Sequence, residues 1–386
     1  NKLEVHGNVI INSTGTLDMD DNNDSNADGQ MYLYGNWTNN LNSLPTTNFL
    51  EGNGTVHFLG STTQIINNNV HSNPEEFANV VLGNDFDTSI SNNLIANGDL
   101  TVNAGKIVTV SPSDYLKVQN GLKNNGTVNI LSDDYSQTGS LVQINDTNTN
   151  IGDIKFERTS TVILNTDYTY WSSPVLDQTL LQVSPNTFLD KFYVYNASIE
   201  DWENVTDPVT YKMVAGKGYI FLGPKTYTAP SLFKATFIGK PNNGKIEIPI
   251  VFNLGAPEGT SNLIGNPYPS AIDADKFLDF NKTVIDGTIY FWTHNTKRQN
   301  RDNFNITDPV TGEIIGTTAG SGTLAYTSDD YASYNLLGGV GTSMAPSGST
   351  GGVNANIPNG KIAAGQAFFT TSKLVSGNAI FNNSMR

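Results

Sequence analysis

The stretch GDLTVNAGKIVTV, residues 98–110, decides the fold of the first part of the chain, because a related stretch, GLKNNGTVNI, begins 23 residues later at Gly121. Further relatives begin at Gly7, at Gly35 and at Gly54. Within them apolar residues alternate with polar ones over short runs, and Asn-Gly and Asn-Asn pairs separate the runs. This period is typical of short strands with one buried face, and helical periodicity is missing.

Strands this short cannot bury a core as isolated hairpins, whereas stacked coils can. We therefore predict an irregular β-helix, or β-solenoid, over residues 1–155, with Asn and Thr ladders along its turns. An ordinary antiparallel sandwich stays open as the alternative for this part of the chain.

The composition changes over residues 156–386, where we expect aromatic-rich strands bounded by Gly, Pro or Asn. Examples are YTYWSSPV, KFYVYN, GKGYIFLG, FKATFIG and GTIYFW. We predict an antiparallel β-sandwich, jelly-roll-like, for this second domain. One short helix, SAIDADKFLDFN with Ser270 as N-cap, and one or two long surface loops over residues 317–360 complete the prediction. The whole chain is expected to be all-β, with a helix content below about 10%.

Charge divides the chain in the same place. Residues 1–150 carry 16 Asp and Glu against four Lys, and residues 151–386 carry 20 against 17 Lys and Arg. This contrast supports two domains with a junction near residues 150–160. The acidic balance disfavours nucleic acid as a partner, because phosphate contacts need clustered Lys or Arg.

Several classes of structure are excluded by composition. The 386 residues contain no Cys, so neither disulfides nor thiolate metal sites are possible. No run of about 18 apolar residues occurs, which argues against a membrane span. The chain opens at Asn1 without a charged-then-apolar leader, so we expect a mature or cut product.

An acidic loop, DMDDNNDSNADGQ at residues 18–30, lies between two of the repeated strands and contains no basic residue. Its DSNADG segment spaces oxygen ligands at alternate positions of a tight turn, which suits Ca²⁺. Position twelve is Gly35 and no helices flank the loop, so it is not an EF-hand. A solvated turn is the alternative. The predicted calcium ligands are Asp18, Asp20, Asp24, Asn26 and Asp28, with Asp21 as a further candidate.

The motifs NLIGNPYPSAIDADKFL, GTIYFWTHNT, DYASYN, GGVGT, KIAAGQAFF and FNNSMR resemble a module of large secreted proteins of Flavobacterium-type Bacteroidota. In those proteins the module commonly precedes a C-terminal sorting domain read by the type IX secretion system. The GDLTVNAG repeats resemble their stalks. The resemblance implies export across the outer membrane and either attachment to the cell surface or release, with no catalytic activity implied.

Signals of catalysis are weak. His6, His57, His71 and His294 are scattered without metal-ligand spacing. Ser172 and Ser173 have no recognisable base partner. A polysaccharide lyase on a β-helix would need basic residues, and residues 1–150 hold only four Lys. Spacing alone does not exclude paired glycosidase carboxylates, and the DWEN stretch at residues 201–204 is one place for them, although such a segment is more often a turn with a packed Trp.

We therefore predict a non-catalytic extracellular cell-surface protein, an adhesin or an envelope structural component, exported by the type IX secretion system. Its expected partners are the secretion machinery and surface polysaccharide or other cell-surface proteins. The alternative is a secreted polysaccharide-binding or polysaccharide-degrading protein. For glycan binding the candidate stacking residues are Trp171, Trp202, Trp292 and their Tyr neighbours, although in a sandwich most of these would be core.

Overall fold

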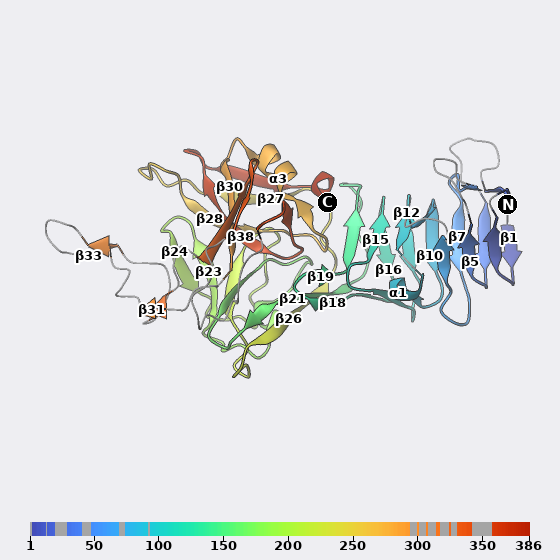
Figure 1. The fold of residues 1–386 in the computed structure, drawn as a ribbon, viewed down its shortest axis with the longest axis horizontal. Coiled ribbons are helices and arrows are strands. Elements are labelled where there is room, and N and C mark those ends of the chain that lie inside the picture. The colour runs from blue at the N-terminus through green and yellow to red at the C-terminus, as the bar shows by residue number, and fades with distance from the viewer. Residues whose placement is uncertain are drawn as a thin grey trace.

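The computed structural model describes residues 2–12, 14–19, 29–40, 48–68, 74–91, 93–293, 299–300, 306–307, 314–316, 324–325, 330–341 and 357–386. It is all-β, with 6% helix and 47% strand, which confirms the predicted class and helix content. Figure 1 shows a row of coils running from the N-terminal end to the middle of the molecule, followed by a broader body of antiparallel sheets.

The first part is a β-solenoid whose coils each contribute three strands. The first strands form one sheet of six parallel strands: β1 (Lys2–Val5), β4 (Gln30–Leu33), β7 (Thr55–Phe58), β10 (Asn79–Leu82), β13 (Leu100–Val102) and β16 (Leu122–Asn124). The second strands are β2 (Val9–Ile11), β5 (Trp37–Asn39), β8 (Ile66–Asn68), β11 (Phe86–Asp87), β14 (Ile107–Val110) and β17 (Thr127–Ile130). The third strands are β3 (Leu17–Asp18), β6 (Phe49–Leu50), β9 (Glu75–Phe77), β12 (Leu94–Ala96), β15 (Tyr115–Val118) and β20 (Ser140–Gln143).

The register between coils explains the sequence repeat. Leu100 pairs with Leu122, 22 residues on, and both side chains are buried inside the solenoid. Thr101 pairs with Lys123 on the outer face. Strands of neighbouring coils pair in parallel, so the predicted solenoid is confirmed and the antiparallel alternative is wrong for this part.

The turns carry the predicted ladders. Asn8 Oδ1 accepts a hydrogen bond from the Asn36 amide at 2.8 Å, and Asn36 Oδ1 accepts from the Ile65 amide one coil further on at 2.9 Å. Thr88 Oγ1 accepts from the Ser111 amide in the same way at 2.8 Å. These side chains satisfy backbone donors that the turns leave without a strand partner.

The solenoid passes into the antiparallel part through one long strand, β21 (Ile154–Ile163). Its first half pairs in parallel with β17 of the last coil, and the whole strand pairs antiparallel with β26 (Ser231–Gly239). The expected boundary at residue 155 therefore falls inside β21. One hydrophobic core cluster runs from Ile11 in the first coil to Ala364, across that boundary.

The remaining strands form two larger sheets and several pairs. One sheet has the order β22 (Tyr168–Trp171), β25 (Tyr219–Leu222), β23 (Phe192–Asn196), β24 (Asp201–Asn204). The other has the order β28 (Ser261–Gly265), β38 (Ala367–Ser372), β30 (Ile285–Trp292), β35 (Tyr331–Asn335), β36 (Gly338–Val340). The pairs are β18 (Ser132–Asp134) with β19 (Gln137–Thr138), β27 (Ile246–Ile250) with β39 (Gly377–Phe381), β29 (Ile272–Asp273) with β37 (Lys361–Ile362), β31 (Gln299–Asn300) with β34 (Leu324–Ala325), and β32 (Ile306–Thr307) with β33 (Ile314–Gly316). The short helices are α1 (Thr88–Ser91), α2 (Leu180–Val183), α3 (Ala274–Asn281) and the 3₁₀ turn η3 (Asn383–Met385).

These sheets stack in layers. The four-stranded sheet lies between the β21–β26 pair and the five-stranded sheet, since Phe221 packs on Phe233 of β26 while its neighbour Ile220 clusters with Leu263 of β28. Helix α3 covers the far side of the five-stranded sheet through the contact of Phe277 with Phe368. This arrangement agrees with the predicted antiparallel sandwich.

Two local expectations were wrong. Helix α3 begins at Ala274 with Asp273 as N-cap, whose carboxylate accepts from the Lys276 amide at 3.1 Å. The chain cannot start the helix at Ser270, because Ile272 and Asp273 pair with β37. Residues 331–340, expected within a surface loop, form the hairpin β35–β36, in which Ala332 and Tyr334 are buried by alternation.

Candidate functional site

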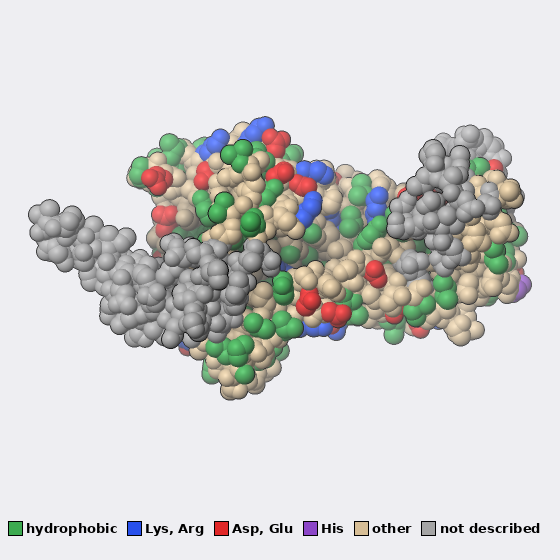
Figure 2. Space-filling model, viewed as in Figure 1, with side chains coloured by type: hydrophobic (Ala, Val, Ile, Leu, Met, Phe, Trp, Pro, Cys, Tyr) green, Lys and Arg blue, Asp and Glu red, His purple; other side chains and the backbone are tan. Residues whose placement is uncertain are grey.

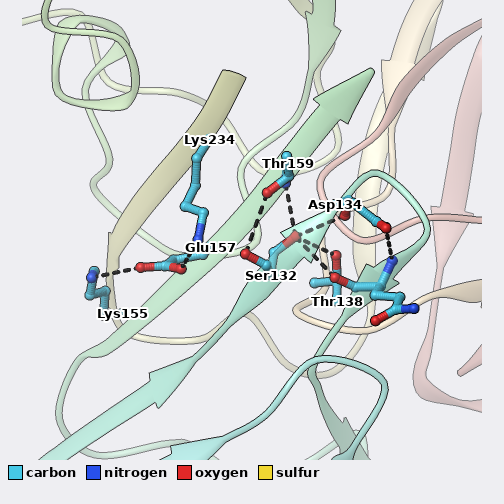
Figure 3. Close-up of polar contacts among 8 residues, drawn as sticks. Ser132, Asp134, Thr138, Lys155, Glu157, Thr159 and Lys234 are labelled. Carbon is cyan, nitrogen blue, oxygen red and sulfur yellow. Dashed lines mark hydrogen bonds and ion pairs between the residues drawn. The ribbon is translucent and has the colours of Figure 1, made fainter. Parts of the chain in front are cut away.

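Polar contacts join the solenoid to the antiparallel sheets at their junction, and Figure 3 shows one group of them. Ser132 of β18 is fully buried, and its Oγ accepts a hydrogen bond from the Thr159 amide of β21 at 3.0 Å. The same hydroxyl lies 3.1 Å from Thr138 Oγ1 across the β18–β19 hairpin. Asp134 closes that hairpin by accepting from the Ser136 hydroxyl and from the Ser136 and Gln137 amides, and these hydrogen bonds lower the pKa of its carboxyl. The last coil is thereby tied to β21.

Glu157 holds the two strands of the junction together. Its carboxylate lies between Lys155 Nζ at 2.7 Å and Lys234 Nζ of β26 at 3.1 Å (Figure 3). Burial raises the pKa of Glu157, but the hydrogen bonds and charges of the two lysines outweigh burial and leave it lowered. The carboxylate is therefore charged and structural at neutral pH.

The side chain of Arg158, the next residue, points from β21 toward Trp171 of the four-stranded sheet. Its guanidinium lies 5.3 Å from the Trp171 ring centroid, and Nη1 has no hydrogen-bond partner. Burial lowers the pKa of Arg158 to about 10, so the side chain stays cationic in neutral solution. This contact with an aromatic face gives the partly buried guanidinium a favourable partner.

The C-terminal residues close the other side of the junction. Arg386 donates to Ser270 Oγ from Nε at 2.9 Å and to the Leu141 carbonyl of the last coil from Nη2, and it lies 4.8 Å from the Tyr268 ring centroid. Burial lowers the pKa of Arg386 to about 9. The Asn383 amide donates to Asp146 Oδ1 at 2.9 Å. Figure 1 shows this end of the chain beside the last coils.

The tryptophans considered for glycan stacking are packed between sheets. Trp171 is 2% exposed and stacks on Phe221. Trp292 stacks on Tyr170 at 5.4 Å between centroids, and Trp202 meets the same Tyr170 ring edge-on. Trp171 is therefore a core residue, whereas Trp202 and Trp292 are partly buried, and Trp202 also contacts Phe369 of the five-stranded sheet.

The residues considered for catalysis are separated. Ser172 and Ser173 are fully buried, and Ser173 Oγ donates to the Val175 carbonyl at 2.7 Å. His57 stacks on Tyr32 and lies 2.8 Å from Gln30 Oε1 on the outer face of the solenoid, and His6 stacks on Tyr34. His71 and His294 lie outside the described residues. The DWEN stretch is the edge strand β24, with its acidic side chains on the surface.

Of the predicted calcium ligands, only Asp18 lies among the described residues. Asp18 ends β3, where it pairs with Leu50 of β6. Asp20, Asp24, Asn26 and Asp28, together with Asp21, lie outside the described residues. Within the part of the chain that is described, no group of three or more His, Cys, Asp or Glu side chains is arranged to hold a metal. The calcium site stays a prediction.

Sequence reasoning missed a buried carboxyl group. Glu75 is 6% exposed and points into the solenoid, where Asn39 Nδ2 donates to its Oε1 at 3.2 Å. Burial raises the pKa of Glu75 to about 7. The signal was available, because alternation along β9 places Glu75 on the same inward side as the buried Phe77.

One family model matches the chain, over residues 63–386, and its description is Domain of unknown function (DUF8693). The match begins just before β8 and includes the junction and the antiparallel sheets. No curated protein and no solved structure matches the chain.

Proposed function

The chain belongs to this family of domains of unknown function, since the model covers most of its length, and we propose that it is a non-catalytic extracellular spacer. In this proposal it is an adhesin or an envelope structural component of the cell surface, exported by the type IX secretion system. The solenoid holds the antiparallel sheets at a distance from whatever lies at its other end.

The continuity of the junction is the observation that carries the proposal. Strand β21 belongs both to the solenoid sheet and to the antiparallel sheet, and one core cluster crosses the boundary. A solenoid whose coils contact only their neighbours is an extended element, and a shared strand leaves no flexible linker at its base. Such an arrangement suits a spacer that must keep a fixed direction.

Export and location rest on the resemblance of the sequence motifs to secreted Bacteroidota proteins. The partners proposed on that ground are the type IX machinery and surface polysaccharide or other cell-surface proteins. On the face drawn in Figure 2, Lys and Arg are interspersed with Asp and Glu, so that face has no basic stripe for nucleic acid. Among the described residues the longest helix, α3, has eight residues, and none could cross a membrane.

The burial of the candidate serines and of Glu75 supports the non-catalytic part of the proposal, whereas the acidic side chains of β24 lie on the surface. Ser172 and Ser173 are buried between layers, and Glu75 lies inside the solenoid, out of reach of a polymer. Arg158 and Arg386 are engaged in packing. An acid–base mechanism needs such groups at a surface where substrate can approach them.

A polysaccharide panel tests the proposal against its alternatives. We expect the purified chain to release neither reducing ends nor unsaturated products from any polymer, and a spacer with adhesive function to be retained by at least one. The heat-unfolded chain is the control for non-specific retention. Turnover on any polymer would overturn the proposal in favour of a degrading enzyme.

Small-angle X-ray scattering tests the spacer itself. A rigid rod joined to a compact body should give one elongated shape that does not change with ionic strength. A scattering profile that needs a broad set of bent shapes would contradict a fixed junction, whatever the polysaccharide assay shows.

A further inference from the structure

One end of the antiparallel sheets carries bulky aliphatic side chains on its turns. The turns are residues 197–200 between β23 and β24, 251–260 between β27 and β28, 336–337 between β35 and β36, and 373–376 between β38 and β39. Leu254 is 96% exposed and Leu337 is 97% exposed. The other exposed aliphatic residues of these turns, at 45–64%, are Ile199, Leu336, Leu374 and Val375. We call these six residues the apolar tips.

Strand register and hydrogen bonds place the four turns together. Strand β28 begins where β38 ends, so the turn before β28 lies beside the turn after β38, and the Phe252 amide donates to Ser376 Oγ between them at 2.9 Å. Asn253 Nδ2 donates to the Ala197 carbonyl at 2.9 Å, which adds the β23–β24 turn. Strand β30 also begins at this end, and its partner β35 returns there before residues 336–337. Because neighbouring strands lie about 4.8 Å apart, the row from β28 to β36 is roughly 20 Å long.

This end of the sheets is not the end that meets the solenoid. The other end of β28 leads to Pro269, whose carbonyl accepts a hydrogen bond from the Leu141 amide of the last coil at 2.8 Å. The apolar tips therefore take no part in joining the solenoid to the sheets.

Polar side chains fix the turns and leave the apolar tips pointing outward. The Leu337 amide donates to Asn335 Oδ1 at 2.8 Å, and the Asn253 amide donates to Thr260 Oγ1 at 2.8 Å. Turns usually present Gly, Pro, Asn, Asp or Ser to solvent, because these residues suit turn geometry. Single exposed aliphatic residues are ordinary, whereas a group of them on neighbouring turns marks an interaction site.

The charges on these turns are of both signs. Glu200 and Glu258 are exposed together with Lys373, and Lys282 forms an ion pair with Asp279 at the nearby end of α3. No excess of one sign is present on the turns to attract a strongly charged partner, so the aliphatic side chains must supply the binding. Separate protruding side chains suit a partner that deforms around each of them. A lipid bilayer does so, since apolar groups enter about 5–10 Å into its headgroup–acyl boundary.

We propose that the apolar tips insert into the surface of a lipid bilayer whose headgroups carry no net charge. A folded protein would instead need a matching row of separate pockets. In this arrangement the sheets contact the lipid at one end, and the solenoid begins at their other end. The inference goes beyond the spacer function proposed above and does not depend on it.

Co-sedimentation of the whole chain with phosphatidylcholine vesicles tests the proposal. We expect binding that changes by less than about twofold between about 0.1 and 0.5 M salt, because contacts of this kind are not screened. Added phosphatidylglycerol should not strengthen it. Leu254→Ser and Leu337→Ser should each weaken binding by about tenfold, since each removes one inserted side chain.

The variant Leu254→Trp gives a direct readout of insertion. Trp favours the membrane interface, so binding should be kept, and bromine-labelled phosphatidylcholine should quench the fluorescence of the new side chain above the background of the natural chain. The matched control is Ile238→Ser, because Ile238 is 59% exposed but lies on β26. This control should bind as the natural chain does, and circular dichroism shows that each variant is folded.

Four results would overturn the proposal. They are no binding to phosphatidylcholine, binding that requires phosphatidylglycerol, binding that Leu254→Ser and Leu337→Ser leave unchanged, and an unquenched Leu254→Trp. Sedimentation velocity without vesicles covers the remaining occupant. Self-association that the two Ser variants abolish would assign the apolar tips to a second copy of the chain and would also overturn the lipid proposal.

Discussion

At the scale of single residues, Glu75 stands out because leucines occupy its position in later coils. It pairs with Leu94, which pairs with Leu116, and Leu116 pairs with Leu141. The folded state therefore holds one carboxyl group in an apolar row. Its pKa of about 7 in the folded protein exceeds its ordinary value of 4.5, so the folded state binds the proton more tightly than the unfolded state does.

The first prediction concerns Glu75→Gln. Stability from the raised pKa is fully present below about pH 4.5 and is lost as pH rises through about 7. Gln keeps the partner for Asn39 but does not ionise. We expect the variant to match the natural chain near pH 4 and to be more stable at pH 8, by up to about 3 kcal/mol. Urea unfolding across this pH range measures the difference, and Glu76→Gln, at an exposed neighbour, is the control. A constant difference at all pH values would refute this account.

Glu75 and Arg386 differ in how well the sequence predicts their surroundings. Glu75 could have been identified by alternation with Phe77, since both lie in the same short strand. Arg386 could not, because its carbonyl partner Leu141 is 245 residues away in sequence. Only the return of the C-terminal segment to the last coil brings those groups together, and no local pattern encodes such a return.

At the scale of elements, the second prediction concerns the acidic loop. If Asp24, Asn26 and Asp28 bind Ca²⁺, the ion stabilises the folded state by mass action, by about 2.7 kcal/mol at a hundredfold excess over its dissociation constant. The melting temperature should rise with millimolar Ca²⁺ and fall with chelator. The double variant Asp24→Asn, Asp28→Asn should lose the response, and Asp133→Asn, in an exposed hairpin, should keep it. Identical melting curves with and without Ca²⁺ would rule out the site.

The third prediction concerns the coils. Leu116 is fully buried, and Leu116→Ala should destabilise the chain by about 2–5 kcal/mol through lost contacts and a cavity. Because each coil contacts only its neighbours, faster hydrogen exchange should be confined to β12, β15 and β20 and the turns between them. Lys117→Ala, one residue along on the outer face, should change stability by less than about 0.5 kcal/mol. Faster exchange throughout the antiparallel sheets would show that stability is not local.

Among the elements, the solenoid was predictable because its signal repeats. The Gly-centred turns and the alternation at residues 98–110 recur in coil after coil, so each copy supports the others. The start of α3 was misjudged, since Ser270 is a good N-cap by type but Ile272 pairs with β37 before the helix begins. The dual pairing of β21 was not predictable either. Its antiparallel partner β26 lies far along the chain, and no local pattern shows that the same strand also pairs in parallel with β17.

At the scale of the whole molecule, the fourth prediction concerns the return of the C-terminal segment. Arg386→Gln removes the hydrogen bonds to Leu141 and Ser270 and the contact with Tyr268. We expect a loss of about 1–3 kcal/mol and faster exchange of the Leu141 and Asn383 amides. Lys282→Gln, whose side chain is 67% exposed in an ion pair with Asp279, is the matched control. Unchanged protection of both amides would mean that Arg386 does not fasten the junction.

The same return of the chain decides how mechanical load would pass through the molecule. If tension acts between β1 and Arg386, it enters at the last coil and follows the solenoid axis, so the antiparallel sheets lie beside the line of force. The hydrogen bonds between coils point along that axis, and bonds loaded in this direction break in succession. Under a pull the solenoid would therefore lengthen one coil at a time while the layered sheets stay intact.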